Sequence, residues 1–318
     1  MLPACKLRDN VDGRLDLEHW IVLLLKLSVC TLFLGRGYLY LSDFSPLSVF
    51  FWNQGWLEKP LLDFFQLEWE QYAATSEPLI RIVQNITGGW FLVCALVCWW
   101  VRPSGRRWTL GVVLIGMVGL MPYWLLSWVD KNYQFAMFLE HFLQWGTPLL
   151  LLLYGRIQVR KWFFLAWLFF ACTFIGHGQY AIGLGVPHSN DFVNMCIRLF
   201  NTDEAGARVM LIVFGWLDFL VVFLALVPAM RLYAMAYAAF WGLATAFSRI
   251  LCHYTPAEDF YGMHPWAAEW IVRNAHGLVP LAMLLVAWQL SFRKKPLGMS
   301  HAGVVASDSK DLSGRGCP

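Results

Sequence analysis

The feature that most constrains this sequence is a series of eight apolar runs, each long enough to cross a bilayer as a helix. About 20 apolar residues are needed, because the hydrocarbon core is about 30 Å thick and a helix rises about 1.5 Å per residue. The runs are residues 20–41, 79–101, 108–129, 135–154, 162–183, 209–228, 232–252 and 266–290. The sequence therefore predicts an all-α protein, a polytopic membrane helical bundle with eight transmembrane helices.

The composition agrees with a membrane environment. Of the 318 residues, 58% are hydrophobic and only 14% are charged, which is too few charges for an ordinary water-facing surface. The aromatic share of 17% suits side chains that sit at membrane interfaces. We expect the lipid bilayer to be the main partner, and we exclude a disordered or nucleic-acid-binding chain.

Basic residues fall in every second connection between the runs. They are Arg102, Arg106 and Arg107; Arg156, Arg160 and Lys161; Arg231; and, after the last run, Arg293, Lys294 and Lys295. Because cytoplasmic loops carry the excess of Lys and Arg, these connections and both termini are predicted to be cytoplasmic. The predicted location is the cell inner membrane. We expect no cleaved signal peptide, since acidic residues precede the first run and no small-residue cleavage stretch follows an apolar core.

The chain is expected to have four segments. They are a cytoplasmic N-terminal segment (1–19), a first four-helix membrane unit (20–155), a second four-helix membrane unit (156–292) and a disordered cytoplasmic tail (293–318). The tail holds Gly, Ser, His and Asp without apolar periodicity. Two outer segments, 48–56 and 191–208, mix apolar and polar residues and are predicted to be helices lying in the interface.

The two units align with each other as an internal repeat. Thr31-Leu-Phe-Leu-Gly-Arg-Gly-Tyr38 aligns without a gap with Cys172-Thr-Phe-Ile-Gly-His-Gly-Gln179. Further matched positions are Gly89-Trp90 with Gly215-Trp216, and Pro148 with Pro280. Four spans in each unit make both units run in the same direction, so the prediction is two parallel four-helix repeats about an axis along the membrane normal. The alternative is a chance match between runs rich in Leu and Phe.

The stretch Leu23-Leu-Leu-Lys-Leu-Ser-Val-Cys-Thr-Leu-Phe-Leu-Gly-Arg-Gly-Tyr38 resembles the first helix of DoxX-like membrane proteins. Those proteins are four-helix bundles, so the resemblance implies two fused units across residues 20–290. The outline is also similar to HTTM-type membrane domains. The DoxX-like resemblance implies a link to quinone-dependent oxidation, and it places no catalytic residue on this chain.

Ionisable side chains inside the spans form the predicted ligand-binding set, because each costs about 2.5–3.5 kcal/mol to place at membrane depth. The set is Arg36, Arg81, Glu140, His141, His177, Asp218, Arg249, Arg273 and His276. All but the deeper Asp218 are expected near the outer ends of their spans, in one polar chamber. Its surplus positive charge would suit a carboxylate, a phosphate or a quinone oxygen. The alternative is that these charges pair with one another and fix the helix registry.

The cofactor is left open, with a quinone as one possibility. Histidines on facing helices could bind haem iron. We do not expect haem, because a Cys-x-x-Cys-His signature is missing and His141 aligns with Arg273 rather than with His276. No metal site is expected. Cys196 and Cys252 fall in outer regions, and the sequence leaves open whether they are bonded.

Whether the protein is an enzyme is also left open, since the sequence has no Walker loop, nucleophile elbow or His-Glu-x-x-His motif. The leading hypothesis is a membrane protein that binds an anionic or quinone-like lipophilic small molecule in the outer chamber, with a redox-linked or accessory role. The alternatives are a small-molecule transporter and a structural subunit with membrane-protein partners. Carriers place their sites near the midplane at broken helices, so charges near the outer ends favour binding.

Overall fold

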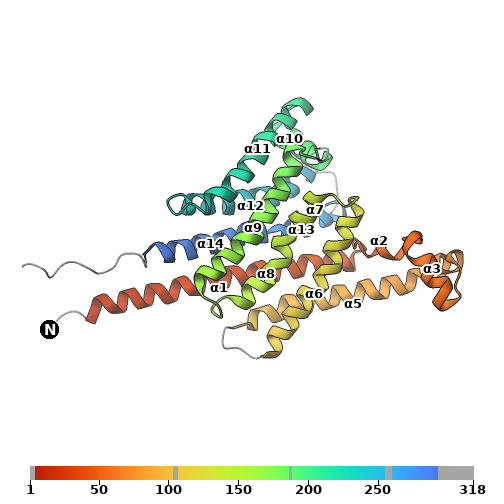
Figure 1. The fold of residues 1–318 in the computed structure, drawn as a ribbon, viewed down its shortest axis with the longest axis horizontal. Helices are drawn as coiled ribbons and strands as arrows, with labels where there is room; N and C mark the ends of the chain where they lie inside the picture. Colours follow the sequence, from red (N-terminus) through yellow and green to blue (C-terminus); the bar gives the residue numbers. More distant parts are fainter. Residues whose placement is uncertain (1–3, 103–106, 186–187, 255–259, 293–318) are drawn as a thin grey trace, which may run out of the picture.

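The computed structural model describes residues 4–102, 107–185, 188–254 and 260–292, and every regular element in these ranges is a helix (Figure 1). The elements are α1 (Ala4–Leu41), α2 (Leu47–Phe51), α3 (Gln54–Phe65), α4 (Trp69–Thr75), α5 (Glu77–Val97), η1 (Cys98–Trp100), α6 (Arg107–Asp130), α7 (Phe135–Glu140), α8 (Phe142–Leu153), α9 (Val159–Ile182), α10 (Asn190–Phe200), α11 (Glu204–Leu224), α12 (Arg231–His253), α13 (Phe260–Arg273) and α14 (Ala275–Phe292). Within the described ranges, eight helical spans are long and apolar enough to cross a membrane. The all-α class and the eight apolar spans are confirmed.

The segment boundaries can be compared only in part. The predicted tail, 293–318, and residues 1–3 lie outside the described residues. Residues 4–19 continue into the first span as the single helix α1. The expected boundary near residue 155 falls in the turn between α8 and α9. The predicted interfacial segment 48–56 overlaps α2 and the start of α3, and the segment 191–208 overlaps α10 and the start of α11.

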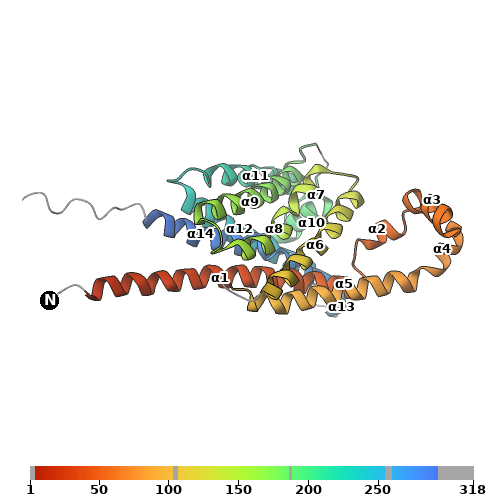
Figure 2. The ribbon, with the colours of Figure 1, turned by 60° about the horizontal axis from the view of Figure 1, so that its bottom comes forward.

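The spans pack in pairs around a central group of helices. Figure 2 shows α1 with α5 in one layer and α9 with α11 in another, while α8, α12 and α14 lie between them. The helices α11 and α12 diverge from the turn at 225–230, since α11 packs mainly on α9 and α12 mainly on α14. The short helix α10 contacts both of them, so it lies across the open end of this V (Figure 1).

The predicted fourth and eighth spans are each broken into two helices, contrary to the expectation of continuous spans. The first break lies at His141, between α7 and α8, and the second at Asn274, between α13 and α14. Thr173 of α9 fills the first break: its hydroxyl accepts the N–H of Leu143 at 2.9 Å and lies 3.2 Å from the carbonyl oxygen of Glu140. Non-helical backbone is tolerated in an apolar bundle when such groups are satisfied within the protein.

Glycines allow the closest helix contacts in the bundle. Gly35 of α1 lies against Ala268 and Val272 of α13, while Gly176 of α9 lies against the backbone of α7 at Ala136 and Glu140. Each of these glycines precedes the ionisable residue of its Gly-x-Gly motif. The first helix of each predicted unit therefore packs on the broken span of the other unit.

The second glycine of each motif faces a glycine within its own predicted unit. Gly37 meets the carbonyl of Gly88 on α5, and Gly178 meets the carbonyl of Gly215 on α11. Gly89, which the sequence alignment matched with Gly215, faces open space, where an added methyl group would meet nothing within 4 Å. The predicted alignment of these two helices was therefore wrong by one residue, because the contact uses Gly88.

We predict opposite effects for two neighbouring substitutions in α5. Gly88→Ala would place its methyl group 2.9 Å from the carbonyl oxygen of Gly37, so it should lower the free energy of unfolding by about 1–3 kcal/mol. Gly89→Ala enters open space and should leave stability unchanged or raise it, since Ala favours helix by up to about 1 kcal/mol. Thermal unfolding of both variants in detergent measures the difference. Equal unfolding midpoints would contradict the tight contact.

Candidate functional site

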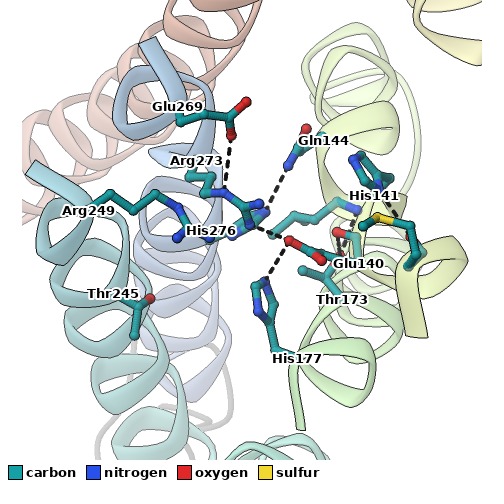
Figure 3. A network of polar contacts seen from close by, with 12 residues as sticks. Glu140, His141, Gln144, Thr173, His177, Thr245, Arg249, Glu269, Arg273 and His276 are labelled. Carbon is teal, nitrogen blue, oxygen red and sulfur yellow. Dashed lines mark hydrogen bonds and ion pairs between the residues drawn. The ribbon is translucent and has the colours of Figure 1, made fainter. Parts of the chain in front are cut away.

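A network of ion pairs joins α1, α7 and α13 inside the bundle, and His177 of α9 lies beside it. Glu140 of α7 accepts a hydrogen bond from Arg273 of α13 and lies 3.9 Å from Nε2 of His177 on α9 (Figure 3). Nε of Arg273 also lies 3.4 Å from a carboxylate oxygen of Glu269, one turn earlier on the same helix. The second oxygen of Glu269 is 3.5 Å from Arg36 of α1. The negative charges of these two carboxylates therefore balance the positive charges of the two guanidinium groups.

Neutral polar groups extend this network. Arg36 is only 1% exposed and donates to the Gln144 side-chain oxygen at 2.7 Å, while its guanidinium carbon lies 3.6 Å from the centre of the Tyr123 ring. The Gln144 amide nitrogen is 3.5 Å from Nε2 of His276. The His276 and His177 rings meet edge to face, with centroids 5.2 Å apart. The network thus crosses between both predicted units.

Most of the predicted set comes together, with three exceptions. Arg36, Glu140, His177, Arg273 and His276 are in the network, and Arg249 lies at its edge. Arg81 was wrongly placed in the chamber: its side chain is 59% exposed and pairs with Glu77 in the same helix at 2.8 Å.

His141 and Asp218 are buried but lie outside the ion-pair network. Nδ1 of His141 is 3.0 Å from the carbonyl of Met137, and its ring packs on Tyr123. Asp218 lies on α11, facing Trp241 of α12. Within the described residues no salt bridge includes Asp218. Asp218 nevertheless lines the same cavity as His177 and Arg249, so it shares a chamber with them without joining the ion pairs.

Three residues of the network were not predicted from the sequence, and one of them, Glu269, changes the net charge of the network. Glu269 sits inside the eighth apolar run, four residues before Arg273, and this spacing places both on one helix face. That pattern could have revealed it. Glu269 removes much of the expected positive surplus by pairing with Arg36 and Arg273. Gln144 and Tyr123 carry no charge and gave no comparable signal.

A cavity of about 320 Å³ lies beside the network, between α9, α10, α11 and α12. This volume is at the lower end of the range of small-molecule sites, about 300–1,000 Å³. Its walls are mostly apolar. They include Phe174, Phe192, Phe200, Leu211, Phe214 and Trp241. His177, Arg273 and His276 also line it, so the cavity and the network share a wall.

Arg249 is a buried arginine beside the network that has no ion-pair partner among the described residues. It lines the cavity, is 8% exposed, and its Nη1 lies 3.6 Å from the Met195 sulfur. Its Nε has no hydrogen-bond partner among the described residues, where no carboxylate lies within ion-pair distance of its guanidinium. A buried charge without a partner is costly, so this guanidinium is suited to an anionic group entering the cavity.

Other chemistry near the cavity is limited. In the part of the chain that the structure describes, no three His, Cys, Asp or Glu side chains are grouped so that they could hold a metal ion. Cys196, which lines the cavity, and Cys252 are both free thiols. Burial raises the pKa of the Cys196 thiol, which disfavours the reactive thiolate.

Comparison of the chain with family models, with curated proteins and with solved structures gave no match. The DoxX-like resemblance of the first span therefore stays a prediction. The site is interpreted from its own geometry and charge.

We predict that the buried and the exposed Glu–Arg pairs differ strongly in their contribution to stability. Glu140→Gln leaves Arg273 with one carboxylate and removes the neighbour of His177, so it should lower the free energy of unfolding by about 3 kcal/mol or more. Glu77→Gln breaks only the exposed pair with Arg81 and should have little effect. Thermal unfolding in detergent compares the two variants. Similar small shifts would show that the network does not stabilise the bundle.

Proposed function

We propose that this protein is a multi-pass inner-membrane protein that binds an anionic, lipophilic small molecule in the cavity between α9, α10, α11 and α12. The observation that carries the proposal is Arg249, a buried guanidinium without an anionic partner in the described residues, at the wall of a mostly apolar cavity. Such a cavity suits an apolar body, and the guanidinium suits a carboxylate or phosphate head group. The role of the bound molecule would be redox-linked or accessory.

The membrane placement is part of this proposal. Large apolar side chains such as Ile86, Trp216 and Phe240 are exposed on the outside of the helices, which suits contact with lipid tails. The connection from α8 into the start of α9 carries Arg156, Arg160 and Lys161, and the connection from α11 into the start of α12 carries Arg231. Both lie at the same end of the bundle as the start of α1 (Figure 1). Both observations support eight membrane-spanning segments with cytoplasmic termini.

The proposal also includes two parallel four-helix repeats. It is supported by the matched contacts of the two Gly-x-Gly motifs, in which Gly35 and Gly176 each pack on a broken span of the other unit. Gly37 and Gly178 each pack on a glycine of their own unit. Equivalent contacts at both glycines of both motifs support a repeat over a chance alignment of apolar runs.

An anionic ligand is favoured over a neutral quinone by the charge of the site. A quinone oxygen could accept a hydrogen bond from Arg249, but it would leave the buried positive charge uncompensated. A carboxylate or phosphate satisfies both the hydrogen-bonding and the electrostatic requirement of a guanidinium. A quinone stays the alternative ligand.

The ligand is proposed to enter from the outer leaflet. The lining residues Leu199, Phe200 and Leu251 are also exposed, and they lie where α10 and α12 meet. An apolar mouth at this position would admit an acyl chain directly from lipid without passage through water.

We predict that Arg249→Met lowers the affinity for decanoic acid at least tenfold, because it removes the guanidinium and keeps an unbranched side chain. Arg81→Met, which changes an exposed arginine outside the cavity, is the matched control and should bind like the unchanged protein. Equilibrium dialysis of detergent-purified protein against labelled decanoic acid measures both. Equal binding by both variants would reject the proposal, and a quinone in the lipid extract of the protein would then identify the alternative ligand.

A transporter is the second proposal, because the fourth and eighth spans are broken at His141 and Asn274. Broken helices near a polar site are a recurring feature of carriers. We predict that a transporter would move labelled decyl sulfonate into proteoliposomes and that Arg249→Met would abolish this uptake. Binding without uptake would favour the first proposal.

A further inference from the structure

A second polar group lies at the inner end of the cavity, away from Arg249. Asp218 of α11 lines the cavity, is 5% exposed, and its Oδ1 has no hydrogen-bond partner among the described residues. The indole of Trp241 is its hydrogen-bonding neighbour. A buried carboxyl oxygen without a partner is rare and costly, so a donor on the ligand would relieve a cost already present in the protein.

Asp218 and Arg249 line one cavity whose walls are mostly apolar. Trp241 and Arg249 lie on the same helix, about two turns apart, which corresponds to roughly 12 Å along its axis. The hydroxyl groups of Thr245 and Ser248 lie between them, but each already donates to a carbonyl of α12. Phe174 and Phe214 are among the residues that form the apolar section of the wall.

We infer that Asp218 determines ligand specificity, and that the ligand is a medium-chain acid with a hydroxyl group at the end opposite its acidic head. The inference rests on the proposed function, since it places the acidic head at Arg249. The terminal hydroxyl donates its hydrogen to the free oxygen of Asp218, and the methylene chain fills the apolar section. A plain fatty acid occupies the same cavity but leaves Asp218 without a donor.

The spacing of the polar ends sets the length of this ligand. An extended chain advances about 1.2 Å per bond, as the backbone does over its three bonds per residue. The rise of roughly 12 Å along α12 between Trp241, the neighbour of Asp218, and Arg249 corresponds to an extended chain of about ten carbons, which we take as the starting length for the ligand. Shorter chains would not reach both groups, and longer chains would have to fold within the cavity.

The test compares decanoic acid with 10-hydroxydecanoic acid by equilibrium dialysis of the full-length protein. The unchanged protein should bind the hydroxy acid about tenfold or more tightly, because only this ligand satisfies the buried carboxyl oxygen. Among hydroxy acids of 6, 8, 10, 12 and 16 carbons, which are chosen around a length of about ten, the affinity should be highest near the middle of the series.

Variants of Asp218 separate its role in selectivity from a role in folding. Asp218→Leu should remove the preference for the hydroxy acid and keep the binding of decanoic acid. Asp218→Asn keeps a side-chain oxygen that accepts a hydrogen bond, so it should keep the preference. Asp130→Leu, at an exposed position at the end of α6, is the control and should behave like the unchanged protein.

The outcomes distinguish this inference from the proposed function. Equal affinity of the unchanged protein for the two acids would overturn the role of Asp218, while binding that depends on Arg249 would still support an anion site. A preference that survives in Asp218→Leu would likewise overturn it. If neither acid binds, both the inference and the proposed function are rejected.

Discussion

The structure depends on the compensation of charges that are buried among apolar helices. Glu140 and Arg273 come from two broken spans, and their pair holds α7 and α13 at one level of the bundle. Arg36 and Glu269 extend this compensation to α1. Removing one partner of such a set leaves a charge in an apolar environment, so the network restricts how these helices can slide along one another.

The helix breaks and the glycines make this arrangement sterically feasible. The helix break at His141 leaves backbone groups without partners in their own helix. The hydroxyl of Thr173 accepts the N–H of Leu143 and lies beside the carbonyl of Glu140. Gly35 and Gly176 then let the first helix of each half approach the broken span of the other half. Small residues commonly allow such close approach in membrane bundles.

The length and hydropathy of the apolar runs were sufficient to predict the fold class, because each run is independently long enough to form a spanning helix. Side-chain direction was harder to predict. Arg81 and Arg249 look alike in the sequence, yet only Arg249 points into the protein, and Glu77 one turn before Arg81 was the available signal. The helix break at His141 was hidden because its support comes from Thr173, which is distant in sequence. The cavity was equally hidden, since it depends on how far α11 and α12 diverge.

Because α11 and α12 diverge, a loosely packed region around the cavity lies beside helices that are connected by ion pairs. The ion-pair network ties α1, α7 and α13 together and α9 packs on α7, whereas α11 and α12 are joined by the turn at 225–230 and have few direct contacts. Movement of α10 would change the width of the cavity and also the surroundings of Arg249 and His177, because Met195 and Phe192 of α10 contact these two residues. Substitutions that change the bulk of Leu199 or Phe200, which line the cavity at the end of α10, would alter the size of the molecule accommodated and leave the contacts of Met195 and Phe192 in place.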